Sequence, residues 1–387
     1  MQKGDAAYIK NMNKKLVLKC IRDHEPISRS EISKKIHMSK PSVSLLVENL
    51  IQEGWVLETG PGKSTVTGGR KPVQLVFNPE SSYVIGVDIG GTKIASGITC
   101  LKGHIYAYRE FATKDYLEGD LLKRLKEDVH DMLKELNLSV HDIMGMGMGV
   151  PGVTNVKEGI VVDAPSLKWV NYPVRERASQ YFPFPIYVEN DVNTSVLGEH
   201  WVGAGKALDH IIYIAVGTGI GSGMILNGKL YRGSSYSAGE MGYLVTDAQK
   251  AKGYQPTFKG YGFLESIASG ASIGKRLSER KNKNMTAKEA FELRRQGDQD
   301  AMEIVDTAVE HLGFGIANYI SLFNPELVII GGGVSGSFDE FEKTLSRIVE
   351  EFTPESCKVV PSTFGREAGI VGAVALFLKE YESVIQI

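Results

Sequence analysis

The sequence has few cysteines and no long apolar run. Three cysteines, Cys20, Cys100 and Cys357, are far apart in the chain. They offer neither a disulfide framework nor a zinc motif, and this usage fits a reducing cytoplasm. No apolar stretch approaches the ~20 residues that a membrane span needs. The first residues, MQKGDAAYIKNMNKK, contain no apolar segment of the secretory type. We therefore expect a soluble, cytoplasmic protein with no membrane partner.

Length and charge indicate more than one domain. The 387 residues exceed the ~250–300 that a single core usually supports, and 42% hydrophobic with 23% charged residues is typical of globular proteins. Residues 1–78 hold 13 Lys and Arg against 7 Asp and Glu, whereas the remainder holds 31 against 39. A basic N-terminal segment on an acidic body favours a nucleic-acid contact confined to that segment. The alternative is a merely solvated basic surface.

The N-terminal segment has the pattern of a helix-turn-helix. Apolar residues in 13–21 follow one helical face, and Pro26 interrupts the chain. A short helix from Arg29 to Ile36 is expected, capped by Ser28 or Ser30. A second helix is expected from Ser39 to about Glu53, with Pro41 in its first turn and Gly54 after its end. Two helices joined by a short turn are typical of DNA-binding domains.

A β-hairpin is expected after these helices and would form a wing. Residues 55–58 and 72–77 have strand patterns, and the loop between them ends in Gly68-Gly69-Arg70-Lys71. Two cations on a glycine-rich tip suit phosphates or a minor groove. The alternative is a small domain that binds protein. We expect the DNA contacts to come from Ser39, Lys40, Ser42, Ser44, Gly69, Arg70 and Lys71.

The body of the chain repeats a strand, a glycine-rich turn and a second strand. The pattern occurs at 83–99 around Asp88–Lys93 and again at 211–226 around 217–223, and Gly331-Gly332-Gly333 follows another strand. Glycines let main-chain N–H groups approach phosphates, and Thr92, Thr218 and Ser222 would add hydroxyl donors. Asp88 would hold magnesium through water. A single such turn is more often a plain hairpin, but three favour a nucleotide-type cleft, without a Rossmann or P-loop signature.

A polar cluster at Val188–Asn193 points to work on hydroxyl groups. Asp191 can take a proton from an attacking hydroxyl that Asn190 orients, and Glu240 and Glu265 would add acceptors. Such a set suits a polyhydroxylated ligand such as a sugar. Equally, Asn190-Asp191-x-Asn193 can be a capping turn for the helix that follows.

Taken in order, these motifs resemble the ROK family of sugar kinases and related repressors, especially its repressor branch. The resemblance covers nearly the whole chain and includes Gly149-Val150-Pro151-Gly152, residues 164–169 and Gly239-Glu240-Met241-Gly242. It implies an α/β protein in which an N-terminal winged helix-turn-helix precedes a two-lobed actin-like/ribonuclease H-like ATPase fold. We expect domains at 1–78 and 79–387, with a first lobe at about 79–195 plus the C-terminal helix and a second at about 196–369.

The resemblance also assigns roles to residues. Asp191 matches the catalytic base of the kinases, and the sugar ligands match Asn190, Asp191, Glu240, Tyr243 and Glu265. The nucleotide-phosphate turns match Asp88, Gly90, Gly91, Thr92, Lys93, Gly217, Thr218, Gly219, Gly332 and Gly333. ATP and magnesium are therefore possible cofactors.

Two departures from the family pattern stand out. Tyr243 occupies the position of a zinc-binding histidine, and residues 258–263 contain no cysteine where the family has a cysteine cluster. A tetrahedral zinc cannot be built from these residues, so no structural zinc site is expected. Tyrosine, phenylalanine and apolar packing would brace the loop instead. Ser166 stands where the kinases commonly have asparagine.

Three functions fit the sequence. The first is a sugar-responsive transcriptional repressor that binds a palindromic operator as a homodimer or a dimer of dimers. The second is an ATP-dependent sugar kinase with a DNA-binding appendage, and the third is a scaffold with neither activity. The complete winged helix favours repression, whereas retention of Asp88 and Asp191 keeps catalysis open.

Overall fold

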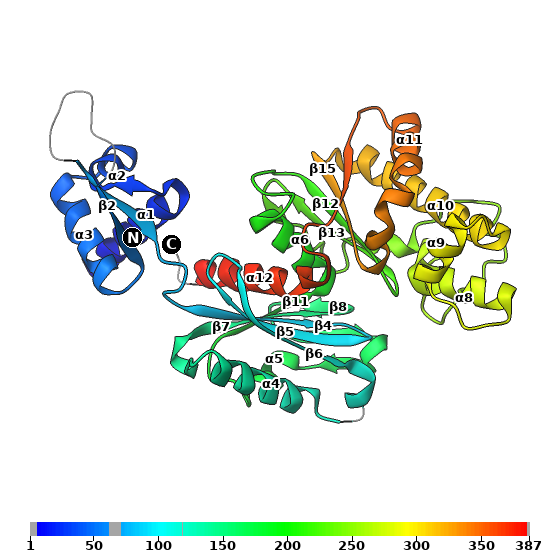
Figure 1. Ribbon diagram of the computed structural model, residues 1–387, viewed down its shortest axis with the longest axis horizontal. Helices are drawn as coiled ribbons and strands as arrows, with labels where there is room; N and C mark the ends of the chain where they lie inside the picture. Colours follow the sequence, from blue (N-terminus) through cyan, green and yellow to red (C-terminus); the bar gives the residue numbers. More distant parts are fainter. Residues whose placement is uncertain (1–5, 62–70, 118, 385–387) are drawn as a thin grey trace. The chain divides into compact units, whose positions relative to one another are not determined.

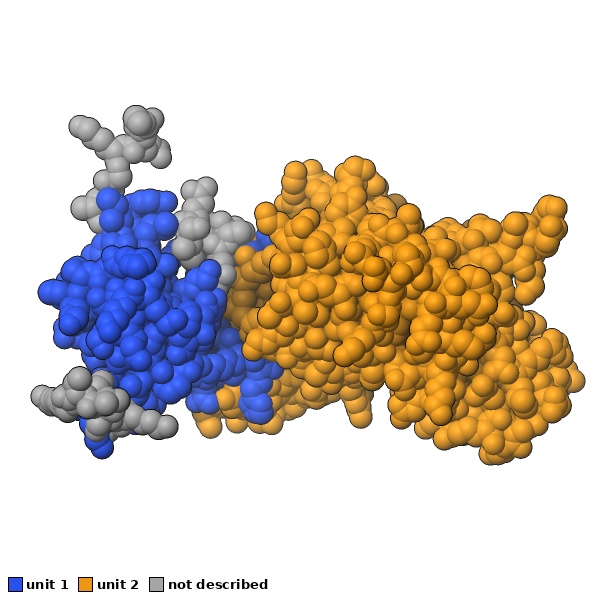
Figure 2. Space-filling view, turned by 90° about the horizontal axis from the view of Figure 1, so that it is seen from above, with its two compact units in different colours: residues 1–83, 100–104, 380–387 blue, residues 84–99, 105–379 orange. Residues whose placement is uncertain are grey.

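The computed structural model describes residues 6–61, 71–117 and 119–384. Its chain divides into two units, which Figure 2 colours separately. Unit 1 consists of residues 1–83, 100–104 and 380–387, and unit 2 of residues 84–99 and 105–379. No helix in the described ranges is long and apolar enough to cross a membrane.

Unit 1 contains the expected helix-turn-helix and hairpin. Ser28 and Glu31 form a capping box at the start of the second helix, and the Ser39 hydroxyl accepts from the Ser42 N–H at the start of the third. Two residues, Ile27 and Ser28, add a strand to the hairpin that the sequence pattern did not indicate. The elements are α1 (Ala6–His24), β1 (Ile27–Ser28), α2 (Arg29–Lys35), α3 (Lys40–Gln52), β2 (Val56–Pro61) and β3 (Val73–Phe77).

Unit 2 is built on two larger sheets, the first of which has the strand order β11-β7-β4-β5-β6. Helices α4 (Leu121–Glu135) and α5 (Val174–Ser179) lie on one face of this sheet and α12 (Ala368–Val384) on the other (Figure 1). Glycine in the strands permits the approach of α12, since a Cβ at Gly147 would lie 1.7 Å from the Ala373 carbonyl oxygen. The strands are β4 (Tyr83–Ile89), β5 (Lys93–Cys100), β6 (Ile105–Ala112), β7 (Ile143–Val150) and β11 (Ile186–Asn190).

The second sheet has the order β14-β13-β12-β15-β16 and is covered on both faces. Along β12, Ile212 and Ile214 pack with α10 (Gln299–Phe323), whereas Ile211 and Tyr213 pack with α6 (Asp191–Val202) and α12. This alternation explains the unbroken apolar run at 211–216, which is typical of a strand buried on both sides. The strands are β12 (Ile211–Val216), β13 (Ile220–Leu226), β14 (Lys229–Leu230), β15 (Leu327–Gly331) and β16 (Lys358–Pro361).

The remaining elements complete unit 2. A small sheet joins β8 (Val153–Asn155), β9 (Ile160–Ala164) and β10 (Trp169–Tyr172). The other helices are α6 (Asp191–Val202), α7 (Phe263–Ala268), α8 (Gly270–Lys281), α9 (Ala287–Arg295), α10 (Gln299–Phe323) and α11 (Glu342–Phe352). The 3₁₀ turns are η1 (Thr113–Tyr116), η2 (Val140–Asp142), η3 (Pro165–Leu167), η4 (Met241–Tyr243), η5 (Gly333–Glu340) and η6 (Gly365–Glu367).

The strands extend further into the glycine-rich segments than the sequence suggested. Asp88 lies inside β4 and Lys93 begins β5, so the first turn is only 90–92. Likewise β13 begins at Ile220, which shortens the second turn to 217–219. Ser222 consequently lies within a strand. The expected lobe boundary near residue 195 falls inside α6.

Candidate functional site

The DNA-binding residues predicted from the sequence lie mainly at the start of α3. Ser39, Lys40 and Ser42 are exposed there, whereas Ser44 is only partly exposed. The Ser39 and Ser42 hydroxyls lie 2.7 Å apart and hydrogen-bond each other, which fixes the first turn of the helix. In the hairpin, Lys71 is exposed, while Gly69 and Arg70 lie outside the described residues.

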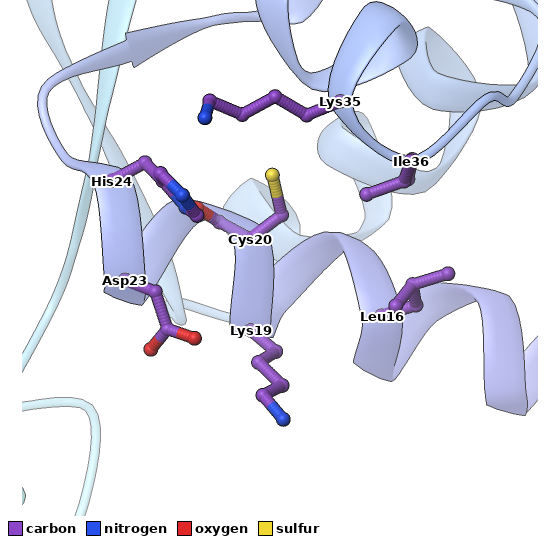
Figure 3. Close-up of a pocket in the computed structure, with 7 residues that line it drawn as sticks. All are labelled: Leu16, Lys19, Cys20, Asp23, His24, Lys35 and Ile36. Carbon is purple, nitrogen blue, oxygen red and sulfur yellow. The ribbon is translucent and has the colours of Figure 1, made fainter.

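A shallow pocket of about 270 Å³ lies between α1 and α2 in the same unit (Figure 3). Its lining mixes a thiol, cations and apolar groups, and no motif in the sequence indicated it. Burial raises the pKa of the Cys20 thiol, which is therefore protonated at neutral pH. The lining residues are Leu16, Lys19, Cys20, Asp23, His24, Lys35 and Ile36.

In unit 2, two aspartates of the predicted site influence each other. Asp88 comes from β4 and Asp191 begins α6. Burial raises the pKa of Asp88 to about 6. Burial, followed by the nearby charge of Asp88, raises the pKa of Asp191 to about 7. Asp191 can therefore accept a proton near neutral pH, as a general base must.

Asn190 satisfies the capping interpretation of its motif. Its side-chain oxygen accepts from the N–H groups of Val192 (2.9 Å) and Asn193 (3.0 Å) at the start of α6. Its amide nitrogen donates to the Gly152 carbonyl and to Oδ1 of Asp191, both at 3.1 Å. The cap therefore also contacts the Asp191 carboxylate, so capping does not exclude the predicted role of Asp191.

Glu240 and Glu265 belong to the same group of carboxylates. The charge of Glu240 contributes to the raised pKa of Asp191, and that of Glu265, after burial, to the raised pKa of Glu240. Glu265 is already engaged, because Oε1 accepts from the Ile220 N–H (2.9 Å) and Oε2 from the Gly262 N–H (3.3 Å). The structure therefore brings the predicted acidic residues into one neighbourhood.

The glycine turns adjoin this neighbourhood, but part of their hydrogen-bonding capacity is used internally. The N–H of Gly90 donates to the Lys93 carbonyl and that of Gly217 to the Gly219 carbonyl, both at 2.9 Å. Gly91, Thr92, Thr218, Gly332 and Gly333 are exposed.

Two side chains of the glycine-rich segments have partners within the protein. The Lys93 ammonium group pairs with Glu110 at 3.0 Å. The hydroxyl of Ser222, expected to face a phosphate, is instead buried and donates to the Gly239 carbonyl (2.9 Å).

Hydrogen-bonded tyrosines occupy the region that corresponds to the family's zinc-binding loop, and we call them the tyrosine brace. The Tyr243 hydroxyl donates to the Gly260 carbonyl (2.8 Å), and that of Tyr261 to the Thr218 carbonyl in the second glycine turn (2.9 Å). Tyr254 donates to the Tyr261 carbonyl (2.8 Å). Among the described residues, no group of three or more His, Cys, Asp and Glu side chains is placed to hold a metal ion. Tyrosines thus connect the Glu240 loop with the glycine turn.

An ion pair connects segments of the two sheets and has no local signal in the sequence. Arg232, which follows β14, pairs with Glu189 at the end of β11. Glu189 also accepts from the Asn190 N–H and the Asn193 amide. The turn at Asn190–Asp191 is therefore held by Glu189, which pairs with an arginine that follows the last strand of the other sheet.

Comparison with known proteins identifies the family to which this chain is similar. A profile of the ROK family matches residues 84–380, and one of the MarR family matches residues 10–59. The chain is 32% identical over 396 residues to the xylose repressor of Caldicellulosiruptor bescii, covering 97% of this chain and 98% of the repressor. It is 34% identical to the glucokinase of Thermotoga maritima, covering 76% of this chain and 96% of the kinase.

A solved structure extends the likeness to the whole fold. It is a ROK family transcriptional regulator described as a homologue of the E. coli MLC protein, with a TM-score of 0.80 at 23% identity, covering 97% of this chain and 98% of the regulator. The family profile spans most of the sequence, and the xylose repressor matches it nearly end to end. The chain therefore belongs to the ROK family and carries an N-terminal winged helix-turn-helix.

Proposed function

We propose that this protein is a transcriptional repressor that binds operator DNA through its winged helix and responds to a sugar bound near Asp191. The observation that carries the proposal is the presence of two features in one chain. One is a capped α3 that exposes Lys40 and Ser42. The other is the carboxylate neighbourhood of Asp88, Asp191 and Glu240.

The chemistry of the carboxylate neighbourhood supports a sugar as the effector. A sugar presents many hydroxyl donors, and three carboxylates from different segments are acceptors: Asp191 at the start of α6, Glu240 just before η4 and Glu265 in α7. A sugar that binds one arrangement of the sheets better than another shifts the equilibrium between them. The predicted lobes at about 79–195 and 196–369 are the parts proposed to move. We expect the coupling to DNA binding to be about 1–3 kcal/mol, a typical allosteric magnitude.

The form of the DNA partner follows from the helix-turn-helix. Such domains usually bind as dimers to two half-sites about one helical turn apart. We therefore propose a palindromic operator and a homodimer or a dimer of dimers, acting in the cytoplasm. The basic charge of residues 1–78 supports attraction to phosphates.

A DNA-binding assay with sugars tests the proposal. An operator is first selected from a randomised duplex library with the full-length protein. Fluorescence anisotropy then measures its affinity with and without D-xylose, D-glucose and N-acetylglucosamine. One sugar should weaken binding about 5- to 150-fold, the range that corresponds to 1–3 kcal/mol. Failure to select any sequence removes the repressor proposal, and a selected operator indifferent to every sugar tested removes the effector part for those sugars.

A sugar kinase is the second candidate, and Asp191 is the observation that favours it. A pKa near 7 suits a base that takes a proton from a sugar hydroxyl. The exposed turns at 91–92 and 332–333 would face the phosphates of ATP and its magnesium ion. Incubation with ATP, Mg²⁺ and the same sugars, followed for ADP release, tests this function. Release that Asp191→Asn abolishes would establish the kinase, and no release above the sugar-free rate would remove it.

A further inference from the structure

The outward face of α3 carries residues that the DNA-contact prediction did not include. Val43, Leu46, Val47 and Leu50 are buried in the core of unit 1. On the opposite face lie Pro41, Leu45, Glu48 and Gln52, with Ser42 and Asn49 at its edge. The helical period of 3.6 residues produces this division, because positions i, i+4 and i+7 share a face.

Leu45 is the unusual member of this face. It is 54% exposed in the middle of a helix whose other leucines are buried. A single exposed leucine is ordinary on a protein surface, so exposure by itself carries no function. Its position is more informative than its exposure. Leu45 projects from the second helix of a helix-turn-helix, one turn beyond Ser42 and one turn before Asn49. That helix enters the major groove in such domains.

The major groove offers matching partners for this set of side chains. Thymine presents a C5-methyl group there, and apolar side chains contact it. Adenine presents an acceptor and a donor side by side, which one asparagine amide can bind together. Cytosine presents an N4 donor that a glutamate can accept, which suits Glu48 on the same face. A face with a leucine, an amide and one carboxylate suits base edges better than it suits phosphates.

We propose that Leu45 reads a thymine methyl group in each operator half-site and that Asn49 reads an adenine beside it. This inference rests on the proposed DNA-binding function and specifies its partner as a half-site containing adjacent A·T pairs. Lys40 and Lys71 would supply phosphate contacts, which add affinity without sequence preference.

Replacement of thymine by deoxyuridine provides the test, because uracil lacks only the methyl group. The full-length protein and its Leu45→Ala variant each select a consensus from a randomised duplex library. Each thymine of the wild-type consensus is then replaced in turn by deoxyuridine, and affinities are measured at constant salt. At one position in each half-site, the replacement should weaken wild-type binding about fourfold, the value of one buried methyl-sized group. The same replacement should leave the DNA affinity of the Leu45→Ala variant unchanged.

Two further variants keep the result interpretable. Leu16→Ala removes a leucine of similar exposure (43%) from α1, at the pocket shown in Figure 3, and should keep the full sensitivity to deoxyuridine. Asn49→Ala should relax the adenine preference in its selected consensus. Circular dichroism and thermal melting confirm that each variant is folded.

The outcomes separate the inference from the function on which it rests. A wild-type consensus in which no thymine methyl group matters, or a Leu45→Ala protein as sensitive to deoxyuridine as the wild type, overturns the role of Leu45 and leaves repression standing. Failure of the wild-type protein to enrich any sequence overturns both. A methyl effect lost only in Leu45→Ala supports the inference.

Discussion

The Nε atom of Arg232 lies 2.6 Å from Oε2 of Glu189, whose side chain is only 2% exposed. Removal of one partner from a buried ion pair leaves an uncompensated charge, which typically costs 3–5 kcal/mol. We expect Arg232→Met to lower the free energy of unfolding by about 3 kcal/mol, the low end of that range, because Asn190 and Asn193 still donate to Glu189. Urea denaturation measures the loss.

The double variant Glu189→Gln with Arg232→Met is the matched control for this pair. It removes both charges, so it should be more stable than Arg232→Met alone. Equal unfolding free energies of the two variants would show that packing of the arginine side chain, and not its charge, stabilises the turn at Asn190–Asp191.

Asp191 should make the stability of unit 2 depend on pH. Its pKa is about 7 in the folded chain and about 3.9 in an unfolded one, so the folded state binds more protons between these values. Its contribution to stability is therefore present at about pH 4 and is lost as the pH rises through 7. Asp191→Asn should raise the melting temperature at pH 8 and change it little at pH 4, measured by differential scanning calorimetry. A variant with the wild-type pH profile would show that another group titrates.

The same substitution separates the sugar site from the DNA site. Asp191 lies in unit 2 and contributes nothing to the core of the winged helix, so Asp191→Asn should keep the affinity for the selected operator in the absence of sugar. The sugar effect on DNA binding should shrink, because one ligand acceptor becomes an amide. Loss of operator affinity without sugar would instead assign Asp191 to the fold.

The wing should contribute affinity that depends on salt. Arg70→Ala together with Lys71→Ala removes two cations from the hairpin, of which Lys71 is exposed and Arg70 lies outside the described residues. Each lost phosphate contact reduces the slope of log K against log salt by about 0.9. A titration from low to high salt should show a slope shallower by roughly 1.8 than that of the wild type. An unchanged slope would remove the wing from the interface.

The tyrosine brace should take the place of a structural zinc. Elemental analysis of the purified, tag-free protein should find no stoichiometric zinc, because the cysteines that would bind it are absent from residues 258–263. Tyr261→Phe loses the hydrogen bond to the Thr218 carbonyl and should cost about 1 kcal/mol of unfolding free energy. One tightly held zinc per chain would overturn the first expectation, and an unchanged stability of Tyr261→Phe the second.

The features that the sequence predicted best are those with short-range causes. Ser28 caps α2 and Ser39 caps α3 because a hydroxyl reaches an N–H two or three residues ahead, which is visible in the sequence itself. The same rule applies to Asn190, for which the capping interpretation is confirmed, while its role as a sugar ligand stays a prediction. The winged helix followed from the helix and strand patterns of residues 13–77, whereas the ROK fold was predicted only through the family resemblance.

Contacts between segments that are distant in the chain could not be predicted from the sequence. Arg232 is 43 residues from Glu189 and Tyr261 is 43 residues from Thr218, and no local pattern states that such pairs meet. The predicted ends of two strands were also wrong. Asp88 and Ser222 are polar and were assigned to turns, but both lie inside strands, where burial or hydrogen bonds to distant segments accommodate them. The residues predicted to bind a sugar and those predicted to bind a nucleotide remain predictions.

The position of α12 has a consequence for synthesis on the ribosome. The core of the winged helix lies within residues 17–75, so it can close while most of the chain is still unmade. The sheet with β4 and β7 receives α12 on one face, and that helix begins only at Ala368. The glycine-containing face of this sheet stays uncovered until residues 368–384 have emerged. The winged helix can therefore fold early, whereas unit 2 completes the core beneath α12 only after residues 368–384 have been synthesised.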